Sequence, residues 1–209
     1  MSKEIAIVFG ASGFLGSHVA EALSSDGYQV RLFDCTPSDF KRGDQEMIVG
    51  DIMNLEDVTK AIQGASVVYN FAAIADIDEA NEKPLATAEV NILGNMNVLE
   101  ASRLSGVRRF IFASSVYVYS ESGSFYRASK QAAERFIETY QDRYGLDYTI
   151  LRYGSLYGRR TDGRNGIYRM LHEAIEQRSI TYKGSGEAIR EYIHVEDAAR
   201  MSVQVLAPE

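Results

Sequence analysis

Tyr126 and Lys130 are the residues whose types and spacing best suit acid–base chemistry on an alcohol. Their spacing of four places a phenol and an ammonium on one face of a helix. Hydride removal from a carbinol needs a base for the hydroxyl proton, yet a phenol with a pKa of about 10 is protonated at neutral pH. Lowering that pKa by roughly three units requires about 4 kcal/mol of preferential phenolate stabilisation, which a nearby ammonium together with a positively charged hydride acceptor can supply in a partly desolvated site.

Ser115 precedes this pair at the end of an apolar segment, Phe110–Ser114, that reads as a strand. A hydroxyl, a phenol and an ammonium would therefore meet at the carboxyl end of a sheet, where ligands bind in open α/β folds. The alternative for such a pair is an ordinary helix surface, and the position after the strand favours catalysis. We expect Tyr126 to act as acid and base, Lys130 to lower its pKa, and Ser115 to orient the substrate hydroxyl.

A glycine-rich loop near the N-terminus predicts a dinucleotide site. Gly10, Gly13 and Gly16 follow the first strand and open the first helix, which permits a tight turn, close approach to a pyrophosphate and close packing of helix on strand. Asp34 ends the second strand, where a carboxylate accepts hydrogen bonds from an adenosine ribose and repels a 2′-phosphate. The predicted cofactor is thus NAD rather than NADP, with Ser12, Phe14 and Leu15 as further loop contacts.

The elements that position these groups alternate along the chain. The apolar runs predict strands at 5–9, 29–33, 47–49, 66–71, 110–114 and 148–153, with helices at 14–25, after Asn54, at 84–104 and at 125–144. Beyond Gly158, helices are expected at 168–177 and 196–206, with a strand at 189–195. Near-continuous apolar strands separated by helices indicate a parallel sheet covered on both faces, a Rossmann-like doubly wound α/β fold.

Composition narrows the classes of function. The 209 residues carry a net charge of −7, which opposes a general role in binding nucleic acid or anionic membranes. Cys35 is the one cysteine, so no internal disulfide or cysteine metal cluster can form, and we expect a cytoplasmic setting. No apolar run approaches membrane-spanning length. His18 and His172 lack metal-spaced partners, so no metal is expected, and His194 is interpreted as a packed core histidine.

The chain resembles the extended short-chain dehydrogenase/reductase family, and within it the nucleotide-sugar epimerases. The resemblance covers essentially the whole chain and rests on these residues: Gly10, Gly13, Gly16, Asp34, Gly50-Asp51-Ile52, Asn70-Phe71-Ala72-Ala73, Asn91 with Gly94, Ser114-Ser115, Tyr126 with Lys130, Leu151-Arg152-Tyr153, Tyr157-Gly158 and Arg190-Glu191-Tyr192-Ile193-His194-Val195.

The resemblance implies further site residues. Asp51 and Ile52 would flank the adenine, and Phe71, Ala72 and Ala73 would line the cofactor cleft. Tyr153 would lie near the nicotinamide, Ser114 and Asn91 would contact the cofactor or support its site, and Lys130 would also bind the nicotinamide ribose. Arg190 and Ser155 would contact the substrate, the guanidinium by meeting its diphosphate.

The same resemblance implies a Rossmann domain over residues 1–158 and a small C-terminal substrate lobe over 159–209 that is truncated relative to family members and can return elements to the first domain. It also implies a homodimer formed by the helices at 84–104 and 125–144. Two features depart from the family. Only ten residues separate Ser115 from Tyr126, where family members usually have a longer loop, and Ser155 replaces an asparagine.

The two residues after Ser115 separate the possible reactions. Nucleotide-sugar dehydratases carry Asp-Glu there and glucuronate decarboxylases carry Glu at the second position, whereas this chain has Val116 and Tyr117. We therefore predict an NAD-dependent nucleotide-sugar epimerase, with a UDP-sugar as substrate, acting through a 4-keto sugar. A sugar dehydrogenase or ketoreductase and a non-catalytic NAD-binding sensor or scaffold are the alternatives.

Two charged clusters are left open by the sequence. Asp76, Asp78, Glu79 and Glu82 form an acidic stretch read as a solvated loop, with substrate-loop or cation contact as the alternative. Arg159, Arg160 and Arg164 form a basic cluster that is either plain surface or, beside Arg190, a receptor for a nucleotide diphosphate.

Overall fold

The computed structural model describes residues 3–181, 187 and 189–207. Its centre is a parallel six-stranded sheet in the order β3-β2-β1-β4-β5-β6. The strands are β1 (Ile5–Phe9), β2 (Gln29–Asp34), β3 (Glu46–Val49), β4 (Val67–Asn70), β5 (Arg109–Ser115) and β6 (Tyr148–Tyr153). This is the strand order of the Rossmann fold. The predicted doubly wound sheet is confirmed.

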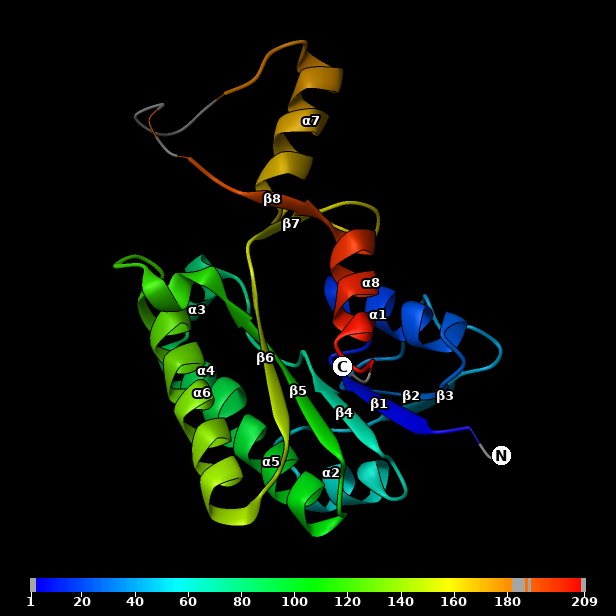
Figure 1. Ribbon diagram of the computed structural model, residues 1–209. Helices are drawn as coiled ribbons and strands as arrows, with labels where there is room; N and C mark the ends of the chain where they lie inside the picture. The colour runs from blue at the N-terminus through cyan, green and yellow to red at the C-terminus, as the bar shows by residue number, and fades with distance from the viewer. Residues whose placement is uncertain (1–2, 182–186, 188, 208–209) are drawn as a thin grey trace.

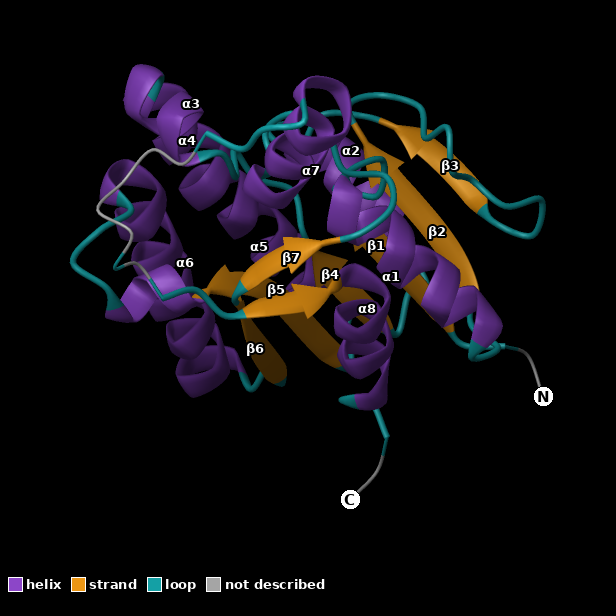
Figure 2. Cartoon of the chain, turned by 90° about the horizontal axis from the view of Figure 1, so that it is seen from above, coloured by secondary structure: helices purple, strands orange, loops and turns teal. Residues whose placement is uncertain are grey.

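Helices cover both faces of the sheet (Figures 1 and 2). α1 (Phe14–Ser25) and α8 (Val195–Gln204) lie on one face, and the remaining helices of the main body lie on the other. These are α2 (Leu55–Ile62), α3 (Ile77–Glu82), α4 (Pro84–Ala88), the π-helical turn η1 (Glu89–Gly94), α5 (Asn95–Leu104) and α6 (Ser124–Tyr144). A 3₁₀ turn, η2 (Val116–Tyr119), joins β5 to α6.

Strand alternation divides the apolar residues into two cores. In β1, Ala6 and Val8 pack with α1 and α8, whereas Ile7 and Phe9 pack with α2, α5 and α6. All four side chains are fully buried. Successive side chains of a strand point to opposite faces, so a five-residue apolar run supplies both layers at once.

The carboxyl ends of the strands bring the predicted site residues to one edge. The glycine loop follows β1, Asp34 ends β2, Phe71 follows β4 and Ser115 ends β5. β1 and β4 are neighbours, and the chain leaves β1 toward β2 on one side and returns at β4 on the other. This is the topological switch point at which open α/β sheets bind ligands.

The C-terminal region makes a second, two-stranded sheet beyond this edge. β7 (Ser155–Tyr157) pairs in parallel with β8 (Tyr192–His194), and α7 (Gly166–Gln177) stands out from the body above them (Figure 1). β7 was not predicted. The small sheet begins at Ser155, inside the range expected for the first domain, and α8 then returns to the main sheet, where Ala199 and Val203 complete the core over α1.

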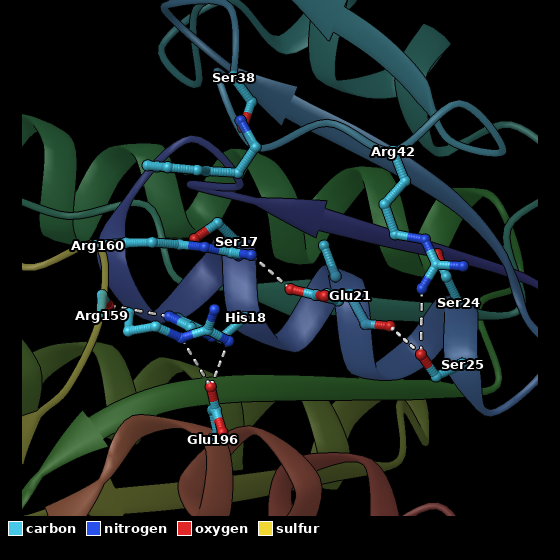
Figure 3. A network of polar contacts seen from close by, with 12 residues as sticks. Ser17, His18, Glu21, Ser24, Ser25, Ser38, Arg42, Arg159, Arg160 and Glu196 are labelled. Atoms are coloured by element: carbon cyan, nitrogen blue, oxygen red, sulfur yellow. Dashed lines mark hydrogen bonds and ion pairs between the residues drawn. The ribbon is translucent and has the colours of Figure 1, made fainter.

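The segment after β7 is fastened to α1 by polar contacts (Figure 3). His18 Nε2 lies 3.0 Å from the Arg159 carbonyl oxygen, and Arg160 pairs with Glu21. The Arg160 guanidinium also stacks 4.7 Å from the ring centroid of Phe40, in the loop after β2. The C-terminal lobe is thus anchored to the glycine-loop helix and to the loop that follows Asp34.

One prediction of local structure was wrong. The acidic stretch after β4 is the helix α3 rather than a loop, because the Asp76 carboxylate accepts the Glu79 N–H at 2.9 Å and Ala80 is buried. The helix expected over 84–104 is confirmed from Pro84 to Leu104, and its middle is the π-helical turn η1, from which Asn91 points inward. The remaining strand and helix bounds differ from the predicted ones by a few residues at most.

Gly16 offers a test of how tightly α1 packs on the glycine loop. A Cβ at Gly16 would collide with the Gly10 carbonyl oxygen, which is backbone and cannot yield easily. We expect Gly16→Ala to lower the free energy of unfolding by about 1–3 kcal/mol, measured by urea denaturation. Gly43→Ala is the control because nothing lies within 4 Å of its added carbon. Equal unfolding midpoints for the two variants would contradict this packing.

Candidate active site

Tyr126, Lys130 and Ser115 meet where β5 passes into α6. Ser115 is the last residue of β5, and Tyr126 and Lys130 lie in the first two turns of α6. Lys130 is 4% exposed, and its Nζ donates to the Ala113 carbonyl oxygen at 2.8 Å. That Nζ also lies 5.8 Å from the ring centroid of Tyr126. The convergence predicted from the sequence therefore exists in the structure.

The pKa values of the phenol and the ammonium respond mainly to burial. Burial raises the pKa of Tyr126, and a hydrogen bond with Ser115 opposes the rise. Burial lowers the pKa of Lys130 to about 8, and the charge of Glu134 opposes that fall. The lowered phenol pKa expected from the sequence is not found in the chain alone, because burial raises the pKa of Tyr126 and Lys130 Nζ donates a hydrogen bond to the Ala113 carbonyl oxygen.

The glycine loop fits a pyrophosphate. Gly13 precedes the first turn of α1, and no side chain caps this helix. An added Cβ at Gly13 would meet only the Gly10 carbonyl oxygen, at 3.3 Å, so the space before the helix is open. Amide groups at an uncapped helix start favour an anion. Gly10 and Gly16 are required by the backbone of the loop. Gly10 has φ +74°, and a side chain at Gly16 would collide with the Gly10 carbonyl oxygen.

Asp34 is placed to receive a ribose. Its Oδ2 accepts the Ser12 N–H at 2.9 Å and its Oδ1 accepts the Thr36 N–H at 3.3 Å. A carboxylate has about four acceptor positions, so further hydroxyl donors can still bind. Phe14 and Leu15, in the first turn of α1, are half-buried beside this loop.

The remaining predicted cofactor residues lie along the same edge. Asp51 is exposed and accepts the Met53 N–H at 2.9 Å, and Ile52 is buried below Gly94. Phe71, Ala72 and Ala73 follow β4 and are half-buried, and the backbone of the first two packs on Gly10.

Three of the predicted residues have their polar groups engaged within the chain. Asn91 bonds both the N–H and the carbonyl oxygen of Ile74, and its Nδ2 donates to Ser129 at 2.9 Å. The Ser114 hydroxyl donates to Glu134 at 2.6 Å. The Tyr153 hydroxyl pairs with Ser202 at 2.6 Å. The polar groups of Asn91 and Ser114 thus fasten the elements that carry the site.

The predicted substrate residues lie on the C-terminal side of the site. The Arg190 guanidinium donates to the Tyr117 hydroxyl at 3.4 Å, and the Tyr117 ring stands edge-on to Tyr126 with centroids 6.4 Å apart. Ser155 begins β7, and its N–H donates to the Glu191 carbonyl oxygen at 3.1 Å. Tyr117 therefore contacts both Arg190 and Tyr126.

Each arginine of the basic cluster Arg159, Arg160 and Arg164 makes an ion pair within the chain. Arg159 pairs with Glu196, Arg160 with Glu21 and Arg164 with Asp162. Of its two alternative readings, the structure favours pairing within the chain over reception of a diphosphate.

The three histidines also have local partners. His194 caps α8 by accepting the Glu196 N–H and is half-buried rather than a core residue. His18 bonds the Arg159 carbonyl, and His172 lies near Glu176 on α7. Over residues 3–181, 187 and 189–207, no group of three or more His, Cys, Asp and Glu residues could hold a metal ion.

Glu134 is the site residue that the sequence analysis missed. It lies one turn after Lys130 on α6, is 6% exposed, and binds both Ser114 and Arg152. The signal was present, because the spacing 126, 130, 134 keeps one helix face. A glutamate on a long helix reads as solvated surface, and only the fold shows that this one is buried.

The chain belongs to the NAD dependent epimerase/dehydratase family, whose pattern it matches over residues 6–209. The resemblance inferred from the sequence is confirmed. The UDP-glucose 4-epimerase of Mycolicibacterium smegmatis is 29% identical, with 97% of this chain and 73% of that protein covered.

Solved structures agree with this family membership. The UDP-glucose 4-epimerase of Thermotoga maritima, solved with UDP-glucose, superposes with a TM-score of 0.89 at 28% identity, covering 97% of this chain and 73% of that one. The UDP-glucose 4-epimerase of Thermus thermophilus, solved with NAD, gives a TM-score of 0.87 at 28% identity, covering 98% and 75%.

Asn91 tests the supporting role of the π-helical turn. Asn91→Ala leaves the partly buried N–H and carbonyl oxygen of Ile74 without the partner they have now, and it removes one of the two hydrogen bonds of the buried Ser129 hydroxyl. We expect it to lower the free energy of unfolding by about 1–3 kcal/mol. Asn97→Ala is the matched control, since that half-buried amide only donates to the carbonyl oxygens of Ile52 and Met53. If urea denaturation gave equal losses for both variants, Asn91 would have no special structural role.

Proposed function

We propose that the chain is an NAD-dependent nucleotide-sugar epimerase whose substrate is a UDP-sugar. The observation that carries the proposal is the placement of the Tyr126 phenol beside a buried ammonium and a serine hydroxyl, at the carboxyl edge of a dinucleotide-binding sheet. Relatives that are 4-epimerases of UDP-glucose support the substrate class. Val116 and Tyr117 follow Ser115, so the acidic pair of the dehydratases is missing at this point.

The residues that would hold NAD come from three strand ends. The uncapped start of α1 receives the pyrophosphate, Asp34 accepts the adenosine ribose hydroxyls, and Ile52 flanks the adenine. Phe71, Ala72 and Ala73 line the middle of the site. When bound, NAD supplies the acceptor that takes a hydride from the sugar carbon and gives it back.

Tyr126 moves the proton that accompanies this exchange. Its phenolate takes the proton of the sugar 4-hydroxyl, which Ser115 holds by a hydrogen bond. Lys130 stabilises the phenolate by charge, because a cation in a low-dielectric site favours the charged form of a neighbouring acid. After the 4-keto sugar turns over, the Tyr126 phenol returns its proton to the oxygen and the opposite epimer forms.

A one-way sugar dehydrogenase or ketoreductase would use the same three side chains. The two reactions differ in their balance of cofactor: an epimerase returns the hydride and accumulates no NADH, whereas a dehydrogenase accumulates one NADH per product. A non-catalytic NAD-binding role would leave Tyr126 without any effect on chemistry. Product chromatography together with absorbance at the NADH band separates the three functions.

Dimerisation and compartment stay predictions. Exposed apolar side chains on the helices expected to form a homodimer support that assembly: Leu85, Leu93, Leu104 and Tyr144. Within the described part of the chain, no helix is both long and apolar enough to cross a membrane. We propose a homodimer, which native mass spectrometry would reveal together with any co-purifying cofactor, and the cytoplasmic setting remains the expectation drawn from the single cysteine.

Tyr126→Phe tests the catalytic proposal. Loss of the acid and base hydroxyl should reduce turnover by about 10²–10⁴-fold, because positioned general acid–base groups contribute that much. Activity is measured on a panel of UDP-, GDP- and dTDP-sugars by product chromatography. Tyr119→Phe is the control, since Tyr119 is 74% exposed. Undiminished turnover of Tyr126→Phe on every accepted sugar would refute the assignment.

Asp34→Asn tests the choice of cofactor. The amide oxygen can still accept the Ser12 N–H, but the charge that holds ribose hydroxyls and repels a 2′-phosphate is gone. We expect NAD to bind about tenfold more weakly, since a hydrogen bond to a charged group is about 1–1.5 kcal/mol stronger than a neutral one, and the preference over NADP to shrink. Isothermal titration with both cofactors measures this, and an unchanged preference would show that Asp34 does not choose between them.

A further inference from the structure

Glu134 is a buried carboxylate for which the proposed acid–base mechanism has no role. Its residue is 6% exposed, one helical turn beyond Lys130 and two beyond Tyr126 on α6. Residues four apart share a helix face, so the three side chains form one row against β5. A buried charge is costly unless it is paired and hydrogen-bonded, so its retention calls for a physical reason.

The carboxylate of Glu134 is held from two strands. Ser114 Oγ donates to Oε1 at 2.6 Å, Arg152 Nε donates to Oε1 at 3.0 Å, and another Arg152 nitrogen donates to Oε2 at 2.8 Å. The bidentate geometry fixes the plane of the carboxylate. The Arg152 guanidinium in turn lies over the Tyr119 ring, 5.0 Å from its centroid.

Lys130 is hydrogen-bonded to β5, at the residue before the one that Glu134 binds. Its Nζ donates to the Ala113 carbonyl oxygen, and Glu134 accepts from the next residue, Ser114. Within the described residues, no carboxylate makes an ion pair at contact distance with Lys130. Its ammonium is surrounded instead by the rings of Phe112 and Tyr126, with centroids 4.7 and 5.8 Å away.

Other charged or titratable residues lie on the elements around this end of α6. They are Tyr117 and Tyr119 on η2, Arg152 and Tyr153 on β6, Asp78, Glu79 and Glu82 on α3, and Glu89 on η1. The charge of Glu134 raises the pKa of Lys130 against the effect of burial. Glu134 thus favours a protonated Lys130.

We propose that Glu134, fixed by Ser114 and Arg152, is a positioning residue that keeps the buried Lys130 ammonium charged beside Tyr126. The proposal rests on the proposed function only for its catalytic consequence. Its physical content, a charge coupling between Glu134 and Lys130, holds for the chain whatever the substrate is.

Lysine NMR tests the coupling without any assay of activity. The chain is labelled at lysine Cε, and Lys130 is assigned as the signal missing from Lys130→Met. The pKa of Lys130 in the unsubstituted chain is about 8. In Glu134→Gln the amide can still accept from Ser114 and Arg152, but the negative charge is gone, so the ammonium loses stabilisation. We expect the titration midpoint of Lys130 to move to lower pH by about half a unit or more.

Glu138→Gln is the matched control. Glu138 lies one turn further on α6 and pairs with Arg135 at the surface, so its removal should leave the Lys130 midpoint in place. If Glu134→Gln unfolds, the same titration on the double variant Glu134→Met/Arg152→Met keeps the test open, because replacing both members of a buried ion pair by apolar side chains is often nearly neutral for stability. The double variant also removes the negative charge that acts on Lys130, so the Lys130 midpoint should again move to lower pH. A Lys130 midpoint that stays at its original pH in Glu134→Gln, or in the double variant if that one is needed, overturns the proposal.

The pH dependence of turnover gives the catalytic consequence. If Lys130 must be charged, the alkaline limb of kcat in Glu134→Gln moves to lower pH together with the NMR midpoint. A purely structural role would lower kcat equally at every pH. A shifted NMR midpoint with full turnover in Tyr126→Phe would uphold the charge coupling and defeat the proposed epimerase, so the two failures are distinguishable.

Discussion

The burial of one ammonium against the carboxyl end of β5 is the constraint on which the site depends. Lys130 is held by a backbone carbonyl and two aromatic rings in a place with little water. Placing a charge there requires a fixed register between α6 and β5. The buried row Lys130, Ala133, Glu134 and Ile137 supplies that register by combining apolar packing with the bonds of Glu134 to β5 and β6. Tyr126, one turn earlier on α6, then lies within hydrogen-bond reach of Ser115.

The rest of the fold serves this edge. Apolar strands buried on both faces make a rigid sheet, and the reversal between β1 and β4 puts the uncapped start of α1 on the same edge as Ser115. The C-terminal segment closes the arrangement by returning α8 onto α1 and by bonding Arg159 and Arg160 to that helix. The elements that would hold a cofactor and the elements that would hold a sugar are therefore in direct contact.

Much of this could be predicted because the signals are local in sequence. The i,i+4 spacing of Tyr126 and Lys130, the glycine loop and the acid ending β2 each depend on one element and its end. The bonding of Asn91 to Ile74 could not be predicted, because it depends on how a π-helical turn meets a loop. The α3 helix could have been found, since Asp76 and Glu79 have the spacing of a helix N-terminus, but the acidic composition masked it. Glu134 shows the same limit, because burial of a charged residue is a tertiary property.

The central claim is that hydride leaves and returns to the same sugar carbon while Tyr126 moves the proton. The most direct measurement uses a UDP-hexose with deuterium at C4, incubated with the chain and NAD and followed by NMR and mass spectrometry of the product. We expect the C4 epimer with its deuterium still at C4 and no hydrogen taken from solvent at that carbon. An epimer whose C4 hydrogen came from solvent, or deuterium recovered in released NADH in step with product, would contradict it.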